Sequence, residues 1–318
     1  MSAALLRYLG TRLLGMAVVM LIVATLVFLI TRLAPGDPAA MMLGEQASAA
    51  DVARLSAQYG LDRPLPEQFG RWLMEVARGN LGHSIFLQIP VGEALLARAE
   101  PTLLLALLGV TLACAIGIPC GVLSAVWHGR MVDQAVTGVA MLGASMPSFW
   151  FGMLLMQLFA VELGWFPVAG YGNPEAPLFF EKLRHLVLPA VVLGVLNSSL
   201  IIRFTRASML DVLSDDYVRT ARAKGLPEVQ TIVRHALRNA LVPVVTVIGL
   251  TAALMIGGAA VTETVFGLPG IGSLVVSAVL RRDYPVIQGA LLVIAATYVL
   301  INLGIDLLYM AIDPRIRY

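Results

Sequence analysis

The sequence predicts an all-α membrane protein with six transmembrane helices. Of its 318 residues, 58% are hydrophobic and only 13% are charged, whereas soluble domains are about half apolar and about a quarter charged. The mean hydropathy of +0.84 agrees with this excess of apolar residues. Six apolar runs along the chain approach or exceed the roughly 20 residues needed to cross a hydrocarbon core of about 30 Å. We therefore expect the chain to lie in a bilayer.

The composition also excludes other classes of protein. The net charge of +2, from 22 basic and 20 acidic residues, provides no basic field for a nucleic acid. Cys114 and Cys120 lie in one apolar run, and on a helix they would point about 120° apart, so they form neither a disulfide nor a zinc site. The histidines have no metal-ligand spacing: His83, His128, His185 and His235. We expect no bound metal.

The expected transmembrane helices are residues 13–30, 102–126, 135–163, 186–202, 240–261 and 286–310. The first run could be a signal peptide, but it is long for one and no small-residue cleavage site follows it. Glycine and proline interrupt the second, third and fifth runs, at residues 117–121, 146–148 and 257–258. Such breaks are either ordinary kinks or features that shape a gated cavity between helices.

Basic residues indicate which loops are cytoplasmic. The loop at 127–133 carries Arg130, and Arg315 and Arg317 follow the last run. The loop at 203–239 carries an excess of basic residues: Arg203, Arg206, Arg219, Arg222, Lys224, Arg234 and Arg238. By the positive-inside rule these regions and both termini are cytoplasmic. Residues 32–100 then lie outside, with short surface helices expected at 49–59 and 65–77.

The apolar segment 264–280 is too short and too rich in glycine and proline at its start to cross a membrane. We place it outside as a re-entrant or interfacial element. Charged residues at its two ends are expected to anchor it to water: Glu263 before it, and Arg281, Arg282 and Asp283 after it.

The loop at 203–239 is expected to form two short helices that meet at a glycine. Ser214 is the expected N-cap of the first helix, which would run through Lys224 and stop at Gly225. Pro227 suits the first turn of the second helix, which would end near Asn239.

The first of these loop helices has a face of small residues with a basic rim. The small residues recur at helical spacing, and the basic ones flank them: Val218, Ala221 and Gly225, with Arg219, Arg222 and Lys224. Such a face could dock into a groove of another protein. Alternatively the loop is solvated, and its arginines only fix the topology or touch anionic lipid. These residues by themselves leave both interpretations open.

A longer stretch of this loop resembles a known motif. The run Asp216-Tyr217-Val218-Arg219-Thr220-Ala221-Arg222-Ala223-Lys224-Gly225 is similar to the EAA loop of binding-protein-dependent ABC importer permeases, in the branch that imports dipeptides, oligopeptides, glutathione and nickel. Further segments resemble that branch, in order along nearly the whole chain: residues 33–38, 59–65, 235–243, 263–270, 282–286 and 313–317. Arg219 and Thr220 replace the general Glu and Ala, and Leu237-Arg238 replaces Leu-Pro. These departures are typical of the peptide branch.

The resemblance implies a type I ABC importer permease fold and a set of partners. Residues 1–93 would form the first transmembrane helix and an external segment, and residues 94–318 a five-helix core. A second homologous permease, two cytoplasmic ATP-binding subunits and an extracytoplasmic binding protein would complete the importer in the bacterial inner membrane. The first loop helix would be the coupling helix, which contacts an ATP-binding subunit through Asp216, Tyr217, Val218, Arg219, Ala221, Arg222, Lys224 and Gly225.

The resemblance further implies a translocation pathway for peptides, with glutathione or nickel chelates as alternative substrates. By analogy, four residues would contribute to its gate: Met146, Ser148, Met255 and Gly257. The chain has no Walker A lysine, because Lys182 follows Glu181 and Lys224 follows Ala223 where that motif has glycine. We therefore expect no enzyme activity and no cofactor in this chain, and we expect ATP and Mg²⁺ in the partner subunits.

Two rival functions have less support from the residues. An ion-coupled secondary transporter needs ionisable groups near the bilayer midplane, but Asp306 lies only about a turn and a half inside the end of the last run. Asn197, Ser198 and Ser199 are residues of the kind that usually join helices in membranes. An intramembrane enzyme needs a nucleophile paired with a base, and no such pair lies inside the apolar runs.

Overall fold

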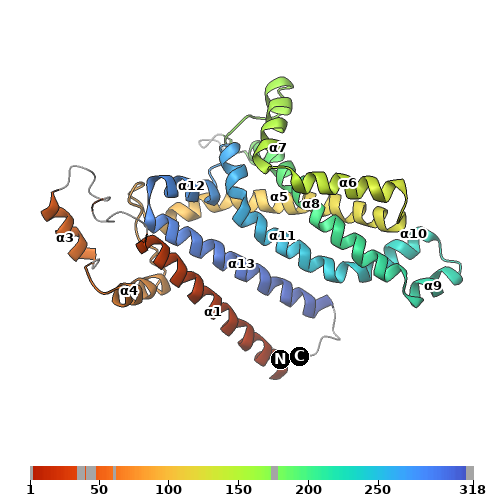
Figure 1. The fold of residues 1–318 in the computed structure, drawn as a ribbon, viewed down its shortest axis with the longest axis horizontal. Helices are drawn as coiled ribbons and strands as arrows, with labels where there is room; N and C mark the ends of the chain where they lie inside the picture. Colours follow the sequence, from red (N-terminus) through yellow and green to blue (C-terminus); the bar gives the residue numbers. More distant parts are fainter. Residues whose placement is uncertain (1–2, 34–39, 41–47, 60–61, 173–177, 313–318) are drawn as a thin grey trace. The chain divides into compact units, whose positions relative to one another are not determined.

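The structure is a computed structural model that describes residues 3–33, 40, 48–59, 62–172 and 178–312. The elements of these residues are helical (Figure 1): α1 Ala3–Leu33, α3 Ala49–Tyr59, α4 Leu65–Ala77, α5 Val91–Val126, α6 Met131–Ser145, α7 Ser148–Leu155, η1 Met156–Glu162, α8 Phe179–Leu213, α9 Asp216–Ala223, α10 Glu228–Gln230, η2 Thr231–Leu237, α11 Arg238–Val265, α12 Ile271–Arg281 and α13 Tyr284–Ile312. The predicted all-α class is confirmed. The short helices α3 and α4 have the bounds that the sequence predicts.

Five helices are long and apolar enough to cross a membrane: α1, α5, α8, α11 and, at the end of the described chain, α13. The third predicted run is instead a broken pair, in which α6 and the continuous α7–η1 segment meet at an angle of 102°. Met146 has extended backbone angles there and Pro147 precedes α7, because the residue before a proline is pushed out of the helical region. The bent pair would make the sixth span.

The glycines of the second run do not interrupt it. Helix α5 continues through Gly117, Pro119 and Gly121, so these residues do not end the helix. A Cβ on Gly117 would lie 2.7 Å from Cβ of Ile201, and one on Gly121 would lie 2.6 Å from Cβ of Thr205. The two glycines therefore allow α5 and α8 to approach closely, which is the usual role of small residues between membrane helices.

The described chain separates into two compact units. Unit 1 contains residues 1–99 and 274–299, and unit 2 contains residues 100–273 and 300–317. Each unit brings together parts of the chain that are distant in sequence. The division predicted from the sequence, into residues 1–93 and 94–318, stays a prediction.

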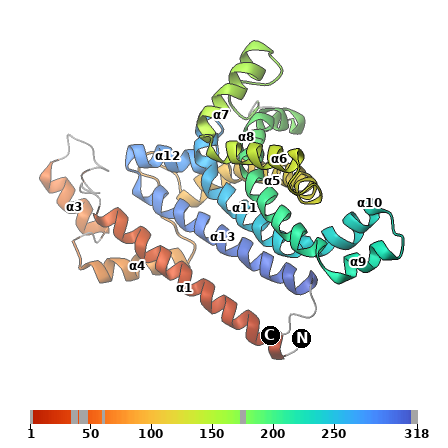
Figure 2. The ribbon, with the colours of Figure 1, turned by 45° about the vertical axis from the view of Figure 1, so that its right-hand side comes forward.

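Unit 2 is built around α8, which packs against α11 and α6 (Figures 1 and 2). Its core includes Leu105 of α5, Leu186 and Ile201 of α8, Val244 of α11, and Phe266, which follows α11. Helix α8 extends past the predicted end at residue 202 to Leu213. Arg203 and Arg206 therefore lie on a rigid helix rather than in a loop.

Unit 1 joins α1 to the segment that contains α4. The ring of Phe28 on α1 lies 5.3 Å from that of Phe69 and 5.6 Å from that of Trp72, both on α4. Within the same unit, Asp283 accepts hydrogen bonds from the Ser84 hydroxyl at 2.5 Å and from the Phe86 backbone N–H at 3.1 Å.

Two acidic residues that were expected to anchor segment 264–280 to water are buried. Glu263 is 0% exposed and Asp283 is 3% exposed. In unit 2, Glu263 accepts a hydrogen bond from the Thr102 hydroxyl at 2.6 Å and another from the Ser273 N–H at 2.9 Å. Buried carboxylates require such partners, so both residues tie backbone segments together. The expected water contact is wrong for them, whereas Arg281 and Arg282 are exposed.

Candidate functional site

The candidate site is the loop that joins α8 to α11, and its first helix is α9. The N-cap position belongs to Asp215, which has extended backbone angles. Ser214 belongs instead to the end of α8, where its hydroxyl donates to the carbonyl of Asp211 at 2.7 Å. The predicted Ser214 cap is therefore wrong by one residue. The glycine stop is confirmed, because Gly225 has a φ of +77°, a conformation that glycine adopts without strain.

The small-residue face of α9 is turned toward the chain itself. Val218 is 0% exposed and Ala221 is 7% exposed. They belong to a core cluster with Met209 of α8, Ala236 of η2 and Ala240 of α11. Docking onto another protein was one of two interpretations left open for this face, and two of its three residues pack within the chain itself, whereas Gly225 is exposed. The surface that α9 presents outward is therefore the opposite one, which carries Asp216, Arg219, Lys224 and part of Tyr217.

Tyr217 braces α9 against the start of α11. Its hydroxyl accepts a hydrogen bond from the side-chain amide of Asn239 at 2.7 Å. The same hydroxyl lies 3.5 Å from the carbonyl oxygen of His235, to which it donates. The tyrosine is 39% exposed, so one edge of its ring remains on the outer surface of the loop.

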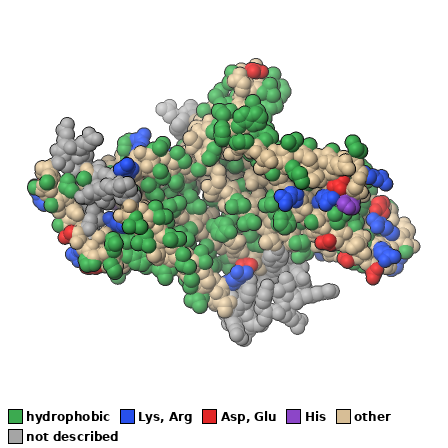
Figure 3. Space-filling model, in the orientation of Figure 1, with side chains coloured by type: hydrophobic (Ala, Val, Ile, Leu, Met, Phe, Trp, Pro, Cys, Tyr) green, Lys and Arg blue, Asp and Glu red, His purple; other side chains and the backbone are tan. Residues whose placement is uncertain are grey.

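An ion pair closes the turn between α9 and α10. Arg222 donates to Glu228 through Nη2 at 2.7 Å and through Nε at 3.2 Å. This bidentate geometry is the strongest form of an arginine–carboxylate contact. Arg222 therefore fastens the loop internally, and Arg219 and Lys224 are the more available cations of the predicted basic rim. Figure 3 shows charged side chains gathered over α9 and α10.

The second loop helix does not end near Asn239 as predicted. Pro227 is its N-cap residue, and the helix continues through η2 into α11 as one apolar span from Glu228 to Val265. No proline interrupts it until Pro243, so the backbone hydrogen bonds carry on into the membrane segment. The helix that follows the turn after α9 is therefore continuous with the membrane segment.

A second polar cluster fixes the neighbouring turn between α5 and α6, and the sequence patterns did not predict it. Asp133 of α6 is buried and forms an ion pair with Arg206 of α8, with Nε–Oδ1 at 2.7 Å and Nη2–Oδ2 at 2.9 Å. It also accepts hydrogen bonds from Ser124 at 2.5 Å and from the Gly129 N–H at 2.9 Å, and His128 Nδ1 lies 3.1 Å away. The partners are 73 residues apart in the chain, so no local pattern pairs them.

The comparisons with known proteins agree with this architecture. Residues 117–318 match the family model described as the binding-protein-dependent transport system inner membrane component, and residues 5–91 match the model of the N-terminal part of such components. The chain belongs to this family. It is therefore a permease subunit of an ABC importer, a multi-pass membrane protein of a transport system.

Curated relatives of the permease match over nearly its full length. A probable peptide ABC transporter permease protein of Sinorhizobium fredii is 48% identical, and the match covers 98% of this chain and 99% of the relative. A glutathione transport system permease protein of Salmonella paratyphi A is 45% identical over 99% of this chain and 100% of the relative. The glutathione permease of Escherichia coli K12 is 42% identical, with the same coverage.

A solved structure shares the fold of the permease. The methionine ABC transporter MetNI, in an inward-facing conformation, superposes with a TM-score of 0.57 and 20% identity. The match covers 69% of this chain and 96% of that chain. The likeness supports the type I importer fold.

The four residues predicted for the gate of the permease lie at the bend between α6 and α7 and on α11. Met146 and Ser148 lie at the bend between α6 and α7. Met255 of α11 is 2% exposed and packs in the core, whereas Gly257 on the same helix is exposed. Their role in a gate stays a prediction.

Proposed function

We propose that the permease forms, with a second homologous permease, a pathway for di- and oligopeptides delivered by an extracytoplasmic binding protein. The name of the Sinorhizobium fredii relative, a peptide ABC transporter permease at 48% identity, supports this substrate class. Glutathione is the second candidate substrate, because relatives of 42% to 45% identity over nearly the whole chain carry that name. Glutathione is itself a tripeptide derivative, so a pathway that accepts short peptides suits glutathione as well.

The outer surface of α9 is the proposed contact with a cytoplasmic ATP-binding subunit. It carries Asp216, Arg219, Lys224 and the exposed edge of Tyr217, and the positive φ of Gly225 shapes its end. The observation that carries this proposal is the division of α9 into a buried apolar side and an exposed charged side. A helix whose inner side is anchored in its own subunit transmits force, whereas a loosely attached loop would absorb it.

The packing beneath α9 supports a coupling role. Val218 and Ala221 rest on Met209 of α8 and on Ala236 and Ala240. The Ser208 hydroxyl of α8 donates to the carbonyl of Ala240 at 2.8 Å. Movement of α9 with an ATP-binding subunit would therefore shift the end of α8 and the start of α11 together, as one rigid body.

The energy would come from outside this chain. We propose that two ATP-binding partner subunits hold ATP and Mg²⁺, because neither lysine of this sequence stands in a Walker A context. The basic segments 127–133 and 203–239 would then face the cytoplasm, with both termini on the same side of the bacterial inner membrane.

Co-purification tests this function. The tagged chain is extracted from its native host in mild detergent, and its partners are identified together with ATP hydrolysis and peptide uptake. Gly225→Val is expected to abolish uptake while the chain stays in the membrane, because valine is strained at a φ of +77°. Gly164→Val is the matched control, since Gly164 also has a positive φ of +64° with open space around it, on a different loop. Normal uptake by the Gly225→Val variant, or peptide transport by the chain alone without ATP, would contradict the proposal.

A further inference from the structure

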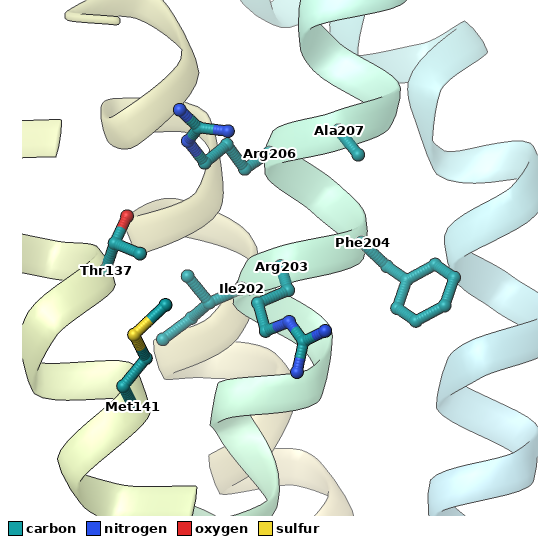
Figure 4. A pocket seen from close by; sticks show the side chains of 7 residues that line it. All are labelled: Thr137, Met141, Ile202, Arg203, Phe204, Arg206 and Ala207. Carbon is teal, nitrogen blue, oxygen red and sulfur yellow. The ribbon is translucent and has the colours of Figure 1, made fainter. Parts of the chain in front are cut away.

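A groove of about 350 Å³ lies between α6 and α8 in unit 2 (Figure 4). Thr137 and Met141 of α6 form one wall, and Ile202, Arg203 and Arg206 of α8 form the other. Its lining is mostly apolar, but two guanidinium groups reach it. The mechanism proposed above makes no use of this groove.

The two arginines differ in their partners. The Arg206 guanidinium is engaged by Asp133 and contacts Nδ1 of His128 at 2.9 Å. Arg203, one turn earlier, is exposed, and it has no hydrogen bond or ion pair with any residue in the described part of the chain. Arg203 is therefore the cation of this groove that is open to an anionic partner from outside the chain.

The position of Arg203 suits a lipid headgroup. It directly follows the apolar run 186–202 and is followed within α8 by the polar final turns up to Leu213, which are proposed to lead to the cytoplasm. The groove itself is rimmed by exposed apolar side chains, since Met141 is 59% exposed and Phe204 is 47% exposed. Side chains of this kind offer acyl chains an apolar surface to lie against. Basic pockets between transmembrane helices on the cytoplasmic side are known to hold anionic headgroups.

We propose that this groove binds an anionic phospholipid of the cytoplasmic leaflet. Its phosphate would pair with the Arg203 guanidinium, and one acyl chain would lie against Met141 and Ile202. The lipid would then bridge α6 and α8 beside the Asp133–Arg206 ion pair. The inference rests on the membrane orientation of the proposed function but not on its substrate or its partners.

Retention of lipid by the full-length chain tests the proposal. The chain, with whatever partners co-purify, is placed in nanodiscs of phosphatidylcholine containing a minor fraction of phosphatidylglycerol. The phosphatidylglycerol that stays bound after transfer to detergent is counted by native mass spectrometry. Arg203→Gln is expected to lower the retained phosphatidylglycerol about fivefold, the effect of one basic residue near a membrane surface. Arg203→Lys should retain most of it, because the charge remains.

Two further variants keep the test decisive. Met141→Trp fills the groove while Arg203 stays intact, so it should also lower the retained phosphatidylglycerol. Arg130→Gln removes an exposed cation elsewhere on the same proposed side of the membrane, so it should not lower it.

Unchanged retention in Arg203→Gln would overturn the proposal. Displacement of the lipid by inorganic phosphate would also overturn it, because the site would then bind a free anion. Loss of peptide uptake with unchanged lipid retention would place Arg203 in the pathway instead. Absence of ATP-binding partners would overturn the proposed function but leave the lipid count interpretable.

Discussion

The hydroxyl of Tyr217 accepts a 2.7 Å hydrogen bond from the side-chain amide of Asn239, and this contact ties helix α9 to the first turn of α11. Tyr217 is partly exposed, whereas Val218 beside it is buried. Helix α9 thus has an exposed side and a side anchored in its own subunit. The proposed coupling role requires both sides.

Removal of this brace should weaken coupling without preventing assembly. Tyr217→Phe keeps the ring but loses the hydroxyl that joins Asn239, at a cost of about 0.5–1.5 kcal/mol. We expect more ATP hydrolysed per peptide transported, measured in proteoliposomes that contain the complete importer. Thr220→Val is the control, because its hydroxyl bonds only within α9, to the carbonyl of Asp216 at 2.8 Å. Equal coupling ratios in the two variants would count against the brace.

Substitutions on the two sides of α9 should have different effects. Ala221→Leu overfills the buried cluster with Met209 and should destabilise the chain by about 1–3 kcal/mol, seen as a lower thermal unfolding midpoint in detergent. Arg219→Glu on the exposed side should leave that midpoint unchanged and reduce co-purification of the ATP-binding subunit. If Arg219→Glu destabilised the chain as much as Ala221→Leu, α9 would not have the two sides described.

The α5–α8 contact should tolerate no side chain at Gly121. Gly121→Val forces a branched side chain against Thr205 and the carbonyl of Ile202, so we expect a large loss of folded protein, measured by size-exclusion chromatography. Gly138→Val is the matched control, since Gly138 is also helical and a Cβ added there would meet no atom of the described chain within 4 Å. Comparable yields of the two variants would contradict the close packing of α5 and α8.

High pH should reveal the environment of Tyr171 in unit 2. Burial, followed by the nearby Glu100 carboxylate, raises the pKa of Tyr171 from 10.0 to about 12. The folded state therefore holds this proton more tightly, and the stabilisation is fully present below pH 10 and is lost as the pH rises toward 12. The tyrosinate absorbance is measured as a function of pH for the native chain and for Tyr171→Phe. The difference between the two curves should have its midpoint near pH 12. Glu100→Gln should lower this midpoint, and an unchanged midpoint would exclude the carboxylate as a cause.

Local patterns predicted much of this fold. The bounds of α3 and α4, the break at Met146 and Pro147, and the positive φ of Gly225 each depend on neighbouring residues. Periodicity also placed Val218 and Ala221 on one face. It could not say what that face touches, because a buried internal face and a docking face both favour small residues.

The remaining features depend on contacts between distant segments. The Asp133–Arg206 pair spans 73 residues, and the buried Glu263 depends on Thr102, which lies far earlier in the chain. Charged residues beside apolar runs normally face water, so sequence reasoning placed Glu263 and Asp283 outside the core. Only the tertiary structure provides the hydroxyl and backbone N–H groups that make their burial stable.

The most direct test of the central claim is cysteine-directed cross-linking in the assembled importer, with the cysteine placed on the outer side of α9. Arg219→Cys should form a cross-link to an ATP-binding subunit, and its yield should change when ATP is added. Gln134→Cys, an exposed position on α6 on the same proposed side, should form none. An intact complex in which Arg219→Cys and Lys224→Cys both fail to cross-link would contradict the assignment of α9 as the coupling helix.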